Sequence, residues 1–172
     1  LGNSDTKISF DEWNVWYVWY RPSCVLDGVF TAMMMNMIIE EANQSGVGIA
    51  CQFEAVNESA IKVTPYEASL TATGQAFALM KEHINGKLLY VSDCVTVSKR
   101  EELTTITFVN PSYDENKRFL FKNSAKIRQS KLYNGKSLMP HHTFEIETLD
   151  VIEKANEYEV NVPPHSLAIV QF

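Results

Sequence analysis

The sequence predicts a protein of mixed class, with an α/β first half and an all-β second half. Strand-like and helix-like patterns alternate up to about residue 85, as is typical of α/β folds. From residue 86 onward, short strand-like runs follow one another without a helical pattern between them, separated by turn signals such as "NPSYDENK" and "NG". This change predicts two domains, residues 1–85 and 86–172, the second an antiparallel, jelly-roll-like β-sandwich.

The first half contains two predicted strands, each followed by a predicted helix. Residues 7–10 form a short apolar strand, and "VGIACQF" has the length and composition of a strand buried on both faces of a parallel sheet. Between them a helix is expected that ends before Gly46 and is covered on more than one side. The helical spacing of its apolar residues places these on one face: Val29, Phe30, Met33, Met34, Met37 and Ile38.

The segment "TPYEASLTATGQAFALMKEH" predicts a loop and then a second helix. Thr71 or Thr73 is available as its N-terminal cap, and the helix is expected to end near Gly86.

Seven strand-like runs make up the second half. The last begins after Pro163 and Pro164, residues that a sheet tolerates only at an edge or at the start of a strand. The runs are residues 88–97, 103–109, 118–127, 131–133, 144–148, 157–162 and 166–172.

Charge and hydropathy exclude several classes of partner. The net charge is −6 and Lys and Arg do not cluster, which argues against nucleic acid and anionic membranes. The longest apolar run, residues 29–39, is about half of what a transmembrane helix needs.

The opening "LGNSDTKISF" has neither an initiator Met nor a leader, so we expect no export signal and an internal start.

The cysteines and histidines suggest neither a disulfide framework nor a metal site. Cys24, Cys51 and Cys94 are widely spaced and odd in number, which favours reduced, buried thiols in a cytoplasmic protein. The four histidines are dispersed, and we expect them at the surface rather than as metal ligands.

The stretch "SFDEWNVWY" is the strongest candidate for chemistry. Glu12 falls at the end of the first predicted strand, where an α/β barrel places catalytic side chains. Aromatic rings pack against sugar rings, and a neighbouring carboxylate is what glycoside hydrolysis requires. On composition alone, a core or subunit interface with a solvated Asp-Glu pair is the more common explanation.

The order of residues in "ISFDEWNVWY" resembles the nucleophile segment of the glycoside hydrolase family 51 α-L-arabinofuranosidases. The resemblance continues through "GVGIACQFEAVN" and "TATGQAFALMKEH", similar to the eighth strand and helix of that family's (β/α)8 barrel. It also covers "LTTITFVNPSYDENK" and "VPPHSLAIV", which are similar to the sandwich that follows the barrel. The resemblance therefore implies the C-terminal part of such an enzyme, with the last two strand–helix units at residues 1–85.

The resemblance also implies roles for individual residues. Glu12 matches the catalytic nucleophile, Trp16 an aromatic wall of the sugar pocket, and Glu54 a polar position at the end of the eighth strand. Asp11 is not the nucleophile in that family, and alternation along a strand sends adjacent Asp11 and Glu12 to opposite faces. The family often has Gln at the position of Glu54. A carboxylate at the end of a loop, with no role in the site, also explains Glu54.

Two features depart from the family's pattern. The chain continues "VWYRPS" where a polar residue, often His, is common, so the pocket rim is expected to differ. A retaining mechanism needs two carboxylates about 5 Å apart, and the strand that carries the acid/base Glu of the family has no counterpart here. The isolated chain is therefore expected to be inactive.

The function implied is part of a retaining hydrolase that releases terminal α-L-arabinofuranosyl groups from arabinan, arabinoxylan or their oligosaccharides. The resemblance implies no metal or organic cofactor and a homo-oligomeric parent protein. Two alternatives stay open: a non-catalytic sugar-binding β-sandwich module, and a related barrel-plus-sandwich glycosidase, of family 39 or 30, with another sugar specificity.

Overall fold

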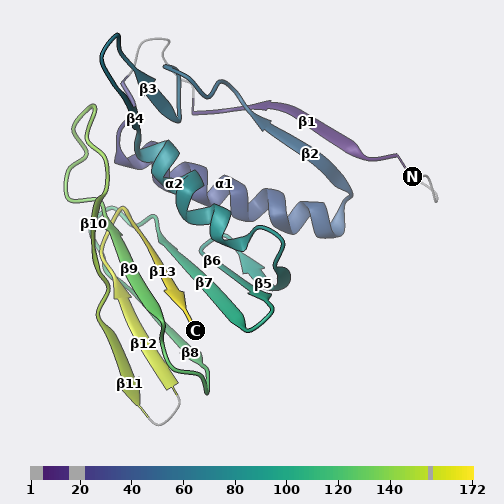
Figure 1. The fold of residues 1–172 in the computed structure, drawn as a ribbon, viewed down its shortest axis with the longest axis vertical. Helices are drawn as coiled ribbons and strands as arrows, with labels where there is room; N and C mark the ends of the chain where they lie inside the picture. Colours follow the sequence, from purple (N-terminus) through teal and green to yellow (C-terminus); the bar gives the residue numbers. More distant parts are fainter. Residues whose placement is uncertain (1–5, 16–21, 155–156) are drawn as a thin grey trace.

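The computed structural model describes residues 6–15, 22–154 and 157–172, and its elements are stacked in layers (Figure 1). A parallel pair of strands, β1 (Ile8–Trp13) and β2 (Val47–Gln52), lies on one side of two helices, α1 (Val25–Gln44) and α2 (Ala72–Met80). A six-stranded sheet lies on the other side of the helices, and a three-stranded sheet packs on its far face.

Short elements complete the first half of the chain. Strands β3 (Ile61–Val63) and β4 (Ala68–Leu70) form a small hairpin before α2, which the sequence did not predict. Thr71 caps α2, as expected, by accepting a hydrogen bond from the Gly74 N–H. The helix ends at Met80 and continues as a 3₁₀ turn, η1 (Lys81–His83), before the chain enters the sheet.

The β-sandwich predicted for the second half is confirmed, and every strand pairing in its two sheets is antiparallel. The larger sheet has the order β10-β9-β13-β7-β6-β5 and the smaller one β11-β12-β8. Their bounds are β5 (Lys87–Ser92), β6 (Val95–Arg100), β7 (Leu103–Asn110), β8 (Lys117–Lys122), β9 (Gln129–Asn134), β10 (Glu145–Thr148), β11 (Val151–Lys154), β12 (Glu157–Val162) and β13 (Ser166–Gln171).

Residue alternation explains why the six-stranded sheet is buried on both faces. Phe108 and Val170 point into the core shared with the three-stranded sheet, whereas Val109 and Ile169, their neighbours in sequence, pack against the helices. Strand β13 lies between β7 and β9 and is buried along its whole length. Pro163 and Pro164 precede the start of β13, as expected. At that position no backbone N–H is needed for pairing with a neighbouring strand.

Helix α1 is fixed to the sheet by a buried amide. The Asn36 side chain donates to the Asp93 carbonyl at 3.0 Å and accepts from the Thr96 hydroxyl at 2.6 Å, in the turn and strand that follow β5. Asn36 and Thr96 are fully buried. The strand–helix part and the sandwich are therefore packed together through a specific polar contact as well as an apolar core.

Three predictions about individual elements were wrong. Residues 88–97 form the hairpin β5–β6 instead of one strand, and β11 was missed. The third concerns the apolar face of the first helix, which begins at Val25, where the Asp27 carboxylate accepts from the Cys24 N–H at 2.8 Å and so satisfies one free donor of the first turn. Its buried stripe is Val25, Val29, Ala32 and Asn36, whereas Phe30 and Met37 are exposed.

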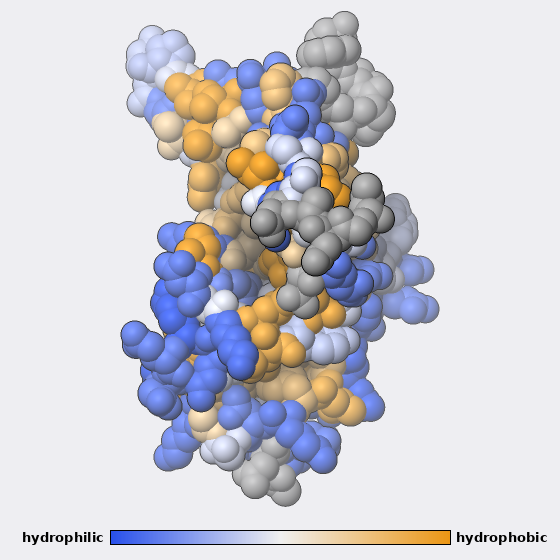
Figure 2. Space-filling model, turned by 90° about the vertical axis from the view of Figure 1, so that its right-hand side faces the viewer, coloured by the Kyte–Doolittle hydropathy of each residue, from blue (hydrophilic) through white to orange (hydrophobic). Residues whose placement is uncertain are grey.

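Burial of the strand "VGIACQF" was also predicted wrongly. Ile49 is 55 % exposed and Cys51 is exposed, since no described strand pairs with the outer edge of β1 or β2 and no described element covers their second face. Figure 2 shows the result as hydrophobic atoms at the surface, at the height of β1 and β2 near the top of the molecule. The expectation of three buried thiols therefore holds for Cys24 but not for Cys51.

Two histidines are not at the surface as expected: His83 is half-buried and His165 is buried. His83 nitrogens lie 2.7 Å from the Ser98 hydroxyl and 3.1 Å from the Thr107 hydroxyl, and burial lowers the pKa of His83 to about 4. His165 is buried edge-on against the Tyr113 ring, and burial lowers its pKa as well. Burial favours the neutral imidazole at both positions.

No helix in the described ranges is both long and apolar enough to cross a membrane.

Candidate functional site

Glu12 is the next-to-last residue of β1, and its side chain is exposed. The following residue, Trp13, is buried and stacks on Phe77 of α2, with the ring centroids 6.0 Å apart. Trp13 thereby holds the end of β1 against the helix layer. The strand end that carries Glu12 is fixed from one side while its carboxylate stays in solvent.

The surroundings of Glu12 differ from those of Asp11. Glu12 lines a shallow hollow of about 350 Å³ between β1 and α1, with Phe10, Phe30 and Phe53. Asp11 does not line this hollow, and its carboxylate accepts a hydrogen bond from the Ser9 hydroxyl. The two adjacent acids therefore occupy separate environments, which agrees with the alternation expected for a strand.

The parallel pairing brings the ends of β1 and β2 together. The Phe53 N–H donates to the Trp13 carbonyl at 3.0 Å, immediately before Glu54. Glu54 is exposed and does not line the hollow beside Glu12. Glu12 and Glu54 thus lie at the same end of neighbouring strands, whereas Trp16, the expected aromatic wall, lies outside the described residues.

A short chain of polar side chains follows Glu12 at this end of the pair. The Asn14 carboxamide oxygen accepts from the Val15 N–H at 2.7 Å and from the Gln52 side chain at 3.4 Å. Gln52 also donates to the Ser59 hydroxyl. The sequence assigned no role to these three residues, because their contacts depend on the register of β1 against β2 and on the loop that follows β2.

The chemistry available at Glu12 is that of a single carboxylate. In the described part of the chain, Glu12 is the one acidic side chain that lines its hollow. No group of three or more His, Cys, Asp or Glu residues within the described ranges is placed to hold a metal ion. The arrangement offers a nucleophile or a proton acceptor, and a retaining glycosidase needs a second carboxylate about 5 Å away.

Solved structures with a similar fold were found, but no protein-family model and no curated protein sequence matches the chain. A family 51 α-L-arabinofuranosidase from Bifidobacterium longum superposes with a TM-score of 0.75 at 16 % identity, over 99 % of this chain and 44 % of that one. The thermostable family 51 α-L-arabinofuranosidase of Thermotoga petrophila RKU-1 gives a TM-score of 0.76 at 19 % identity, over 96 % of this chain and 43 % of that one.

A glycosidase of another family is similar at a lower level. The catalytic domain of family 30 xylanase C from Talaromyces cellulolyticus superposes with a TM-score of 0.64 at 12 % identity, over 98 % of this chain and 41 % of that one. The chain spans less than half the length of each of these structures. It shares its fold with part of the glycoside hydrolase family 51 α-L-arabinofuranosidases.

Proposed function

We propose that the chain is the C-terminal part of a retaining α-L-arabinofuranosidase, in which Glu12 is the nucleophile. In this proposal, residues 1–85 supply the last two strand–helix units of a (β/α)8 barrel and residues 86–172 supply the sandwich. The observation that carries it is the position of Glu12, exposed at the end of a parallel strand, within the segment that resembles the nucleophile motif. The fold shared with family 51 structures supports the same assignment.

The proposed reaction has two steps. The Glu12 carboxylate attacks the anomeric carbon, a C–O bond forms as the glycosidic C–O bond breaks, and the leaving oxygen takes a proton from an acid/base carboxyl group. Water then attacks the arabinosyl-enzyme ester and gives its proton back to that group, which releases arabinose with its configuration retained. Glu54, at the same end of the next strand, is assigned to substrate binding, and so is Trp16.

The proposal includes inactivity of the 172 residues by themselves. Closing a barrel requires every strand to pair on both edges, and the outer edges of β1 and β2 have no partner among the described strands. The acid/base group must then come from a part of the parent protein outside this chain. Release of nitrophenol from nitrophenyl α-L-arabinofuranoside by the 172 residues, abolished by Glu12→Gln, would contradict this.

The deciding experiment uses the protein made from the whole reading frame that encodes these residues. We expect Glu12→Gln to lower kcat on nitrophenyl α-L-arabinofuranoside by roughly 10³-fold or more. Asp11→Asn, which removes the neighbouring charge outside the hollow, serves as the matched control and should keep most of the activity. Azide should restore turnover by Glu12→Ala and give an arabinosyl azide of inverted configuration, because azide then attacks the face that Glu12 occupied.

A second candidate is a barrel-plus-sandwich glycosidase that acts on another sugar, and the fold similarity to the family 30 xylanase favours it. A panel of nitrophenyl glycosides on the same protein separates the two. Preference for the xyloside over the arabinofuranoside, with Glu12 still required, would keep the mechanism and replace the substrate.

A further inference from the structure

Cys94 and Lys117 form a pair of reactive side chains that lies outside the candidate site. The Lys117 Nζ donates to the Cys94 Sγ at 3.1 Å, so a thiol and an amine are in direct contact. Cys94 lies in the turn between β5 and β6, and Lys117 is the first residue of β8. The contact therefore joins the six-stranded sheet to the three-stranded sheet of the sandwich.

The backbone on both sides of this contact is held in place. The Val109 N–H donates to the Cys94 carbonyl at 2.8 Å, and the buried Asn36 side chain donates to the carbonyl of the residue before Cys94 at 3.0 Å. Lys117 pairs with Val162 in the ladder between β8 and β12. The packing of the two sheets thus brings the sulfur and the nitrogen together.

The surroundings of Lys117 direct its head group toward the sulfur. No carboxylate among the residues that the structure describes forms an ion pair with Lys117. Its nitrogen lies 5.6 Å from the centre of the Phe119 ring, a distance at which an aromatic face attracts a cation. Phe119 packs in turn on the buried Phe108, with the ring centroids 4.8 Å apart. The half-buried lysine is therefore held between a fixed ring and the Cys94 sulfur.

Cys94 is accessible to a small oxidant. It is partly exposed, whereas Cys24 is buried and Cys51 is exposed. A partly exposed cysteine beside a cationic group is the setting in which a peroxide oxidises a cysteine to a sulfenic acid. The sulfur of a sulfenic acid is electrophilic and condenses with a nearby nitrogen to form a sulfenamide. At Cys94 the nitrogen in contact is that of Lys117.

We propose that Cys94 and Lys117 form a reversible oxidative cross-link, with hydrogen peroxide as the oxidant. First, the Cys94 sulfur takes one oxygen atom from the peroxide, whose O–O bond breaks, so that the thiol becomes a sulfenic acid and water leaves. Next, the Lys117 amine, after losing its ammonium proton to solvent, attacks the sulfur. An S–N bond forms, the S–O bond breaks, and the hydroxyl leaves as water with a proton from the nitrogen. One thiol, one amine and one peroxide thus give one sulfenamide and two waters.

The cross-link acts on the stability of the sandwich. It closes a covalent loop that contains β6 and β7 and ties the two sheets together. A covalent link between distant positions stabilises the folded state mainly by restricting the unfolded chain, so oxidation should raise the melting temperature. The inference is independent of the proposed hydrolase activity, because neither Cys94 nor Lys117 lines the hollow beside Glu12.

The test treats the 172-residue chain with hydrogen peroxide at mildly alkaline pH, followed by tryptic peptide mapping. We expect residues 88–99 linked to residues 101–118, with two hydrogens lost and no cleavage after the modified Lys117. Dithiothreitol should separate the two peptides, because two thiols reduce the S–N bond to a thiol and an amine. Exposed Cys51, which has no hydrogen bond to a described lysine, should give sulfenic or sulfinic acid instead. Cys94 recovered as free thiol, as a disulfide or as unlinked sulfinic acid would overturn the proposal.

Three variants make the result specific. Lys117→Arg keeps a cation at the start of β8 and removes the amine, so the linked peptide should be lost and Cys94 should proceed to sulfinic acid. Cys94→Ser should abolish both the linked peptide and the rise in melting temperature on oxidation. Lys122→Arg, the same change at the other end of β8, is the matched control and should retain both. A linked peptide that survives Lys117→Arg, or cross-linked wild type with an unchanged melting temperature, would contradict the proposal.

Discussion

Strands β2 and β13 are similar in sequence and opposite in environment. "VGIACQ" and "SLAIVQ" are six-residue, mostly apolar strands, yet β2 is largely exposed and β13 is buried at every position. Strand β13 has a neighbour on each edge and a layer on each face, whereas β2 pairs with β1 alone among the described strands. The apolar composition of a strand therefore predicts that its faces are covered. It does not show whether these residues or another part of the protein cover them.

This difference bears on function because Glu12 lies in the region with open edges. Parallel sheets occur almost only with both faces covered, so the β1–β2 pair supports the proposal that further strands of a parent protein complete it. The sandwich needs no such addition. Predictions that compare the two regions follow, from the largest effect to the smallest.

Replacing one phenylalanine in each region should give the largest contrast. Phe108 of β7 is 1 % exposed and packs against the rings of Phe119 and Phe121, whereas Phe10 of β1 is 38 % exposed. Phe108→Ala should lower the free energy of unfolding by about 3–5 kcal/mol, and Phe10→Ala by less than about 1 kcal/mol. Urea unfolding measures both, and similar losses would mean that β1 is as well supported as the sandwich.

The contact between the two regions depends on Asn36. Asn36→Ala removes the acceptor of the Thr96 hydroxyl and the donor to the Asp93 carbonyl, and should cost about 1–3 kcal/mol of unfolding free energy. Asn116→Ala, an exposed loop position, is the control and should cost almost nothing. An Asn36→Ala protein as stable as the wild type would show that the buried amide does not hold α1 to the sheet.

Acid should destabilise the protein through His83. Its pKa is lowered from 6.5 to about 4 by burial, so the unfolded chain takes up a proton at a higher pH than the folded one. The stability due to neutral His83 is complete above pH 6.5 and declines as the pH falls toward 4, by about 1–2 kcal/mol at pH 5. Unfolding of wild type and His83→Gln at pH 7.5 and pH 5 should show the smaller decline in the variant; parallel declines would rule His83 out.

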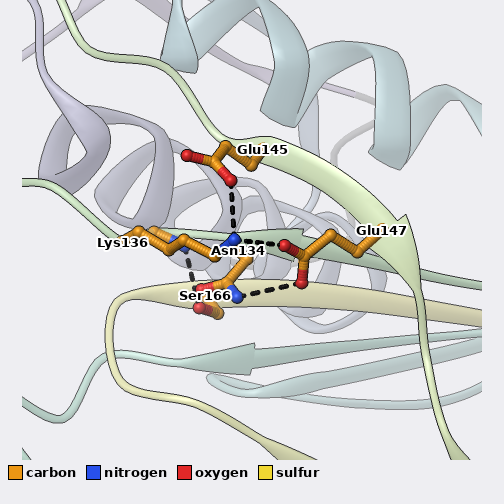
Figure 3. Close-up of polar contacts among 6 residues, drawn as sticks. Asn134, Lys136, Glu145, Glu147 and Ser166 are labelled. Atoms are coloured by element: carbon orange, nitrogen blue, oxygen red, sulfur yellow. Dashed lines mark hydrogen bonds and ion pairs between the residues drawn. The ribbon is translucent and has the colours of Figure 1, made fainter.

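The smallest effect is expected at the surface of the β9–β10 hairpin. Hydrogen bonds from Lys136 to Glu145 and Glu147 raise the pKa of Lys136, but all three side chains are solvent-exposed. Solvent screens such pairs, so Lys136→Ala should leave the melting temperature nearly unchanged. A large fall in the melting temperature would indicate that the cluster in Figure 3 supports the global fold and not only the local segment.

Much of the architecture could be predicted from the sequence, because it depends on local patterns. The change of pattern near residue 85, the Thr71 cap and the prolines before β13 all act within a few residues of where they stand. The β5–β6 turn was missed because the polar interruption in "YVSDCV" is too short to separate one strand from two. Strand β11 was missed because "VIEK" is only four residues long and shows no clear alternation of apolar and polar residues. Whether β2 and His83 are buried depends on contacts with layers that are distant in sequence. The periodicity of apolar residues within one segment carries no information on such contacts.

The candidate site was predictable in part. The position of Glu12 at a strand end followed from the motif, and its separation from Asp11 followed from strand alternation. The connection from Asn14 through Gln52 to Ser59 could not be predicted, because it depends on the register of β1 against β2. His141 and His142 line a cavity together with Asn14 and Ser59, and this arrangement depends on how the sandwich packs against the helices.

The contrast between the two regions is tested most directly by amide hydrogen exchange in the 172-residue chain under native conditions. Amides of β7 and β13 should open only with global unfolding, whereas those of β1 and β2 should exchange through local openings that cost far less free energy. Protection of Ile49 and Ala50 equal to that of Val109 and Ile169 would contradict this account. It would show that β1–β2 is complete as it stands and needs no further strands.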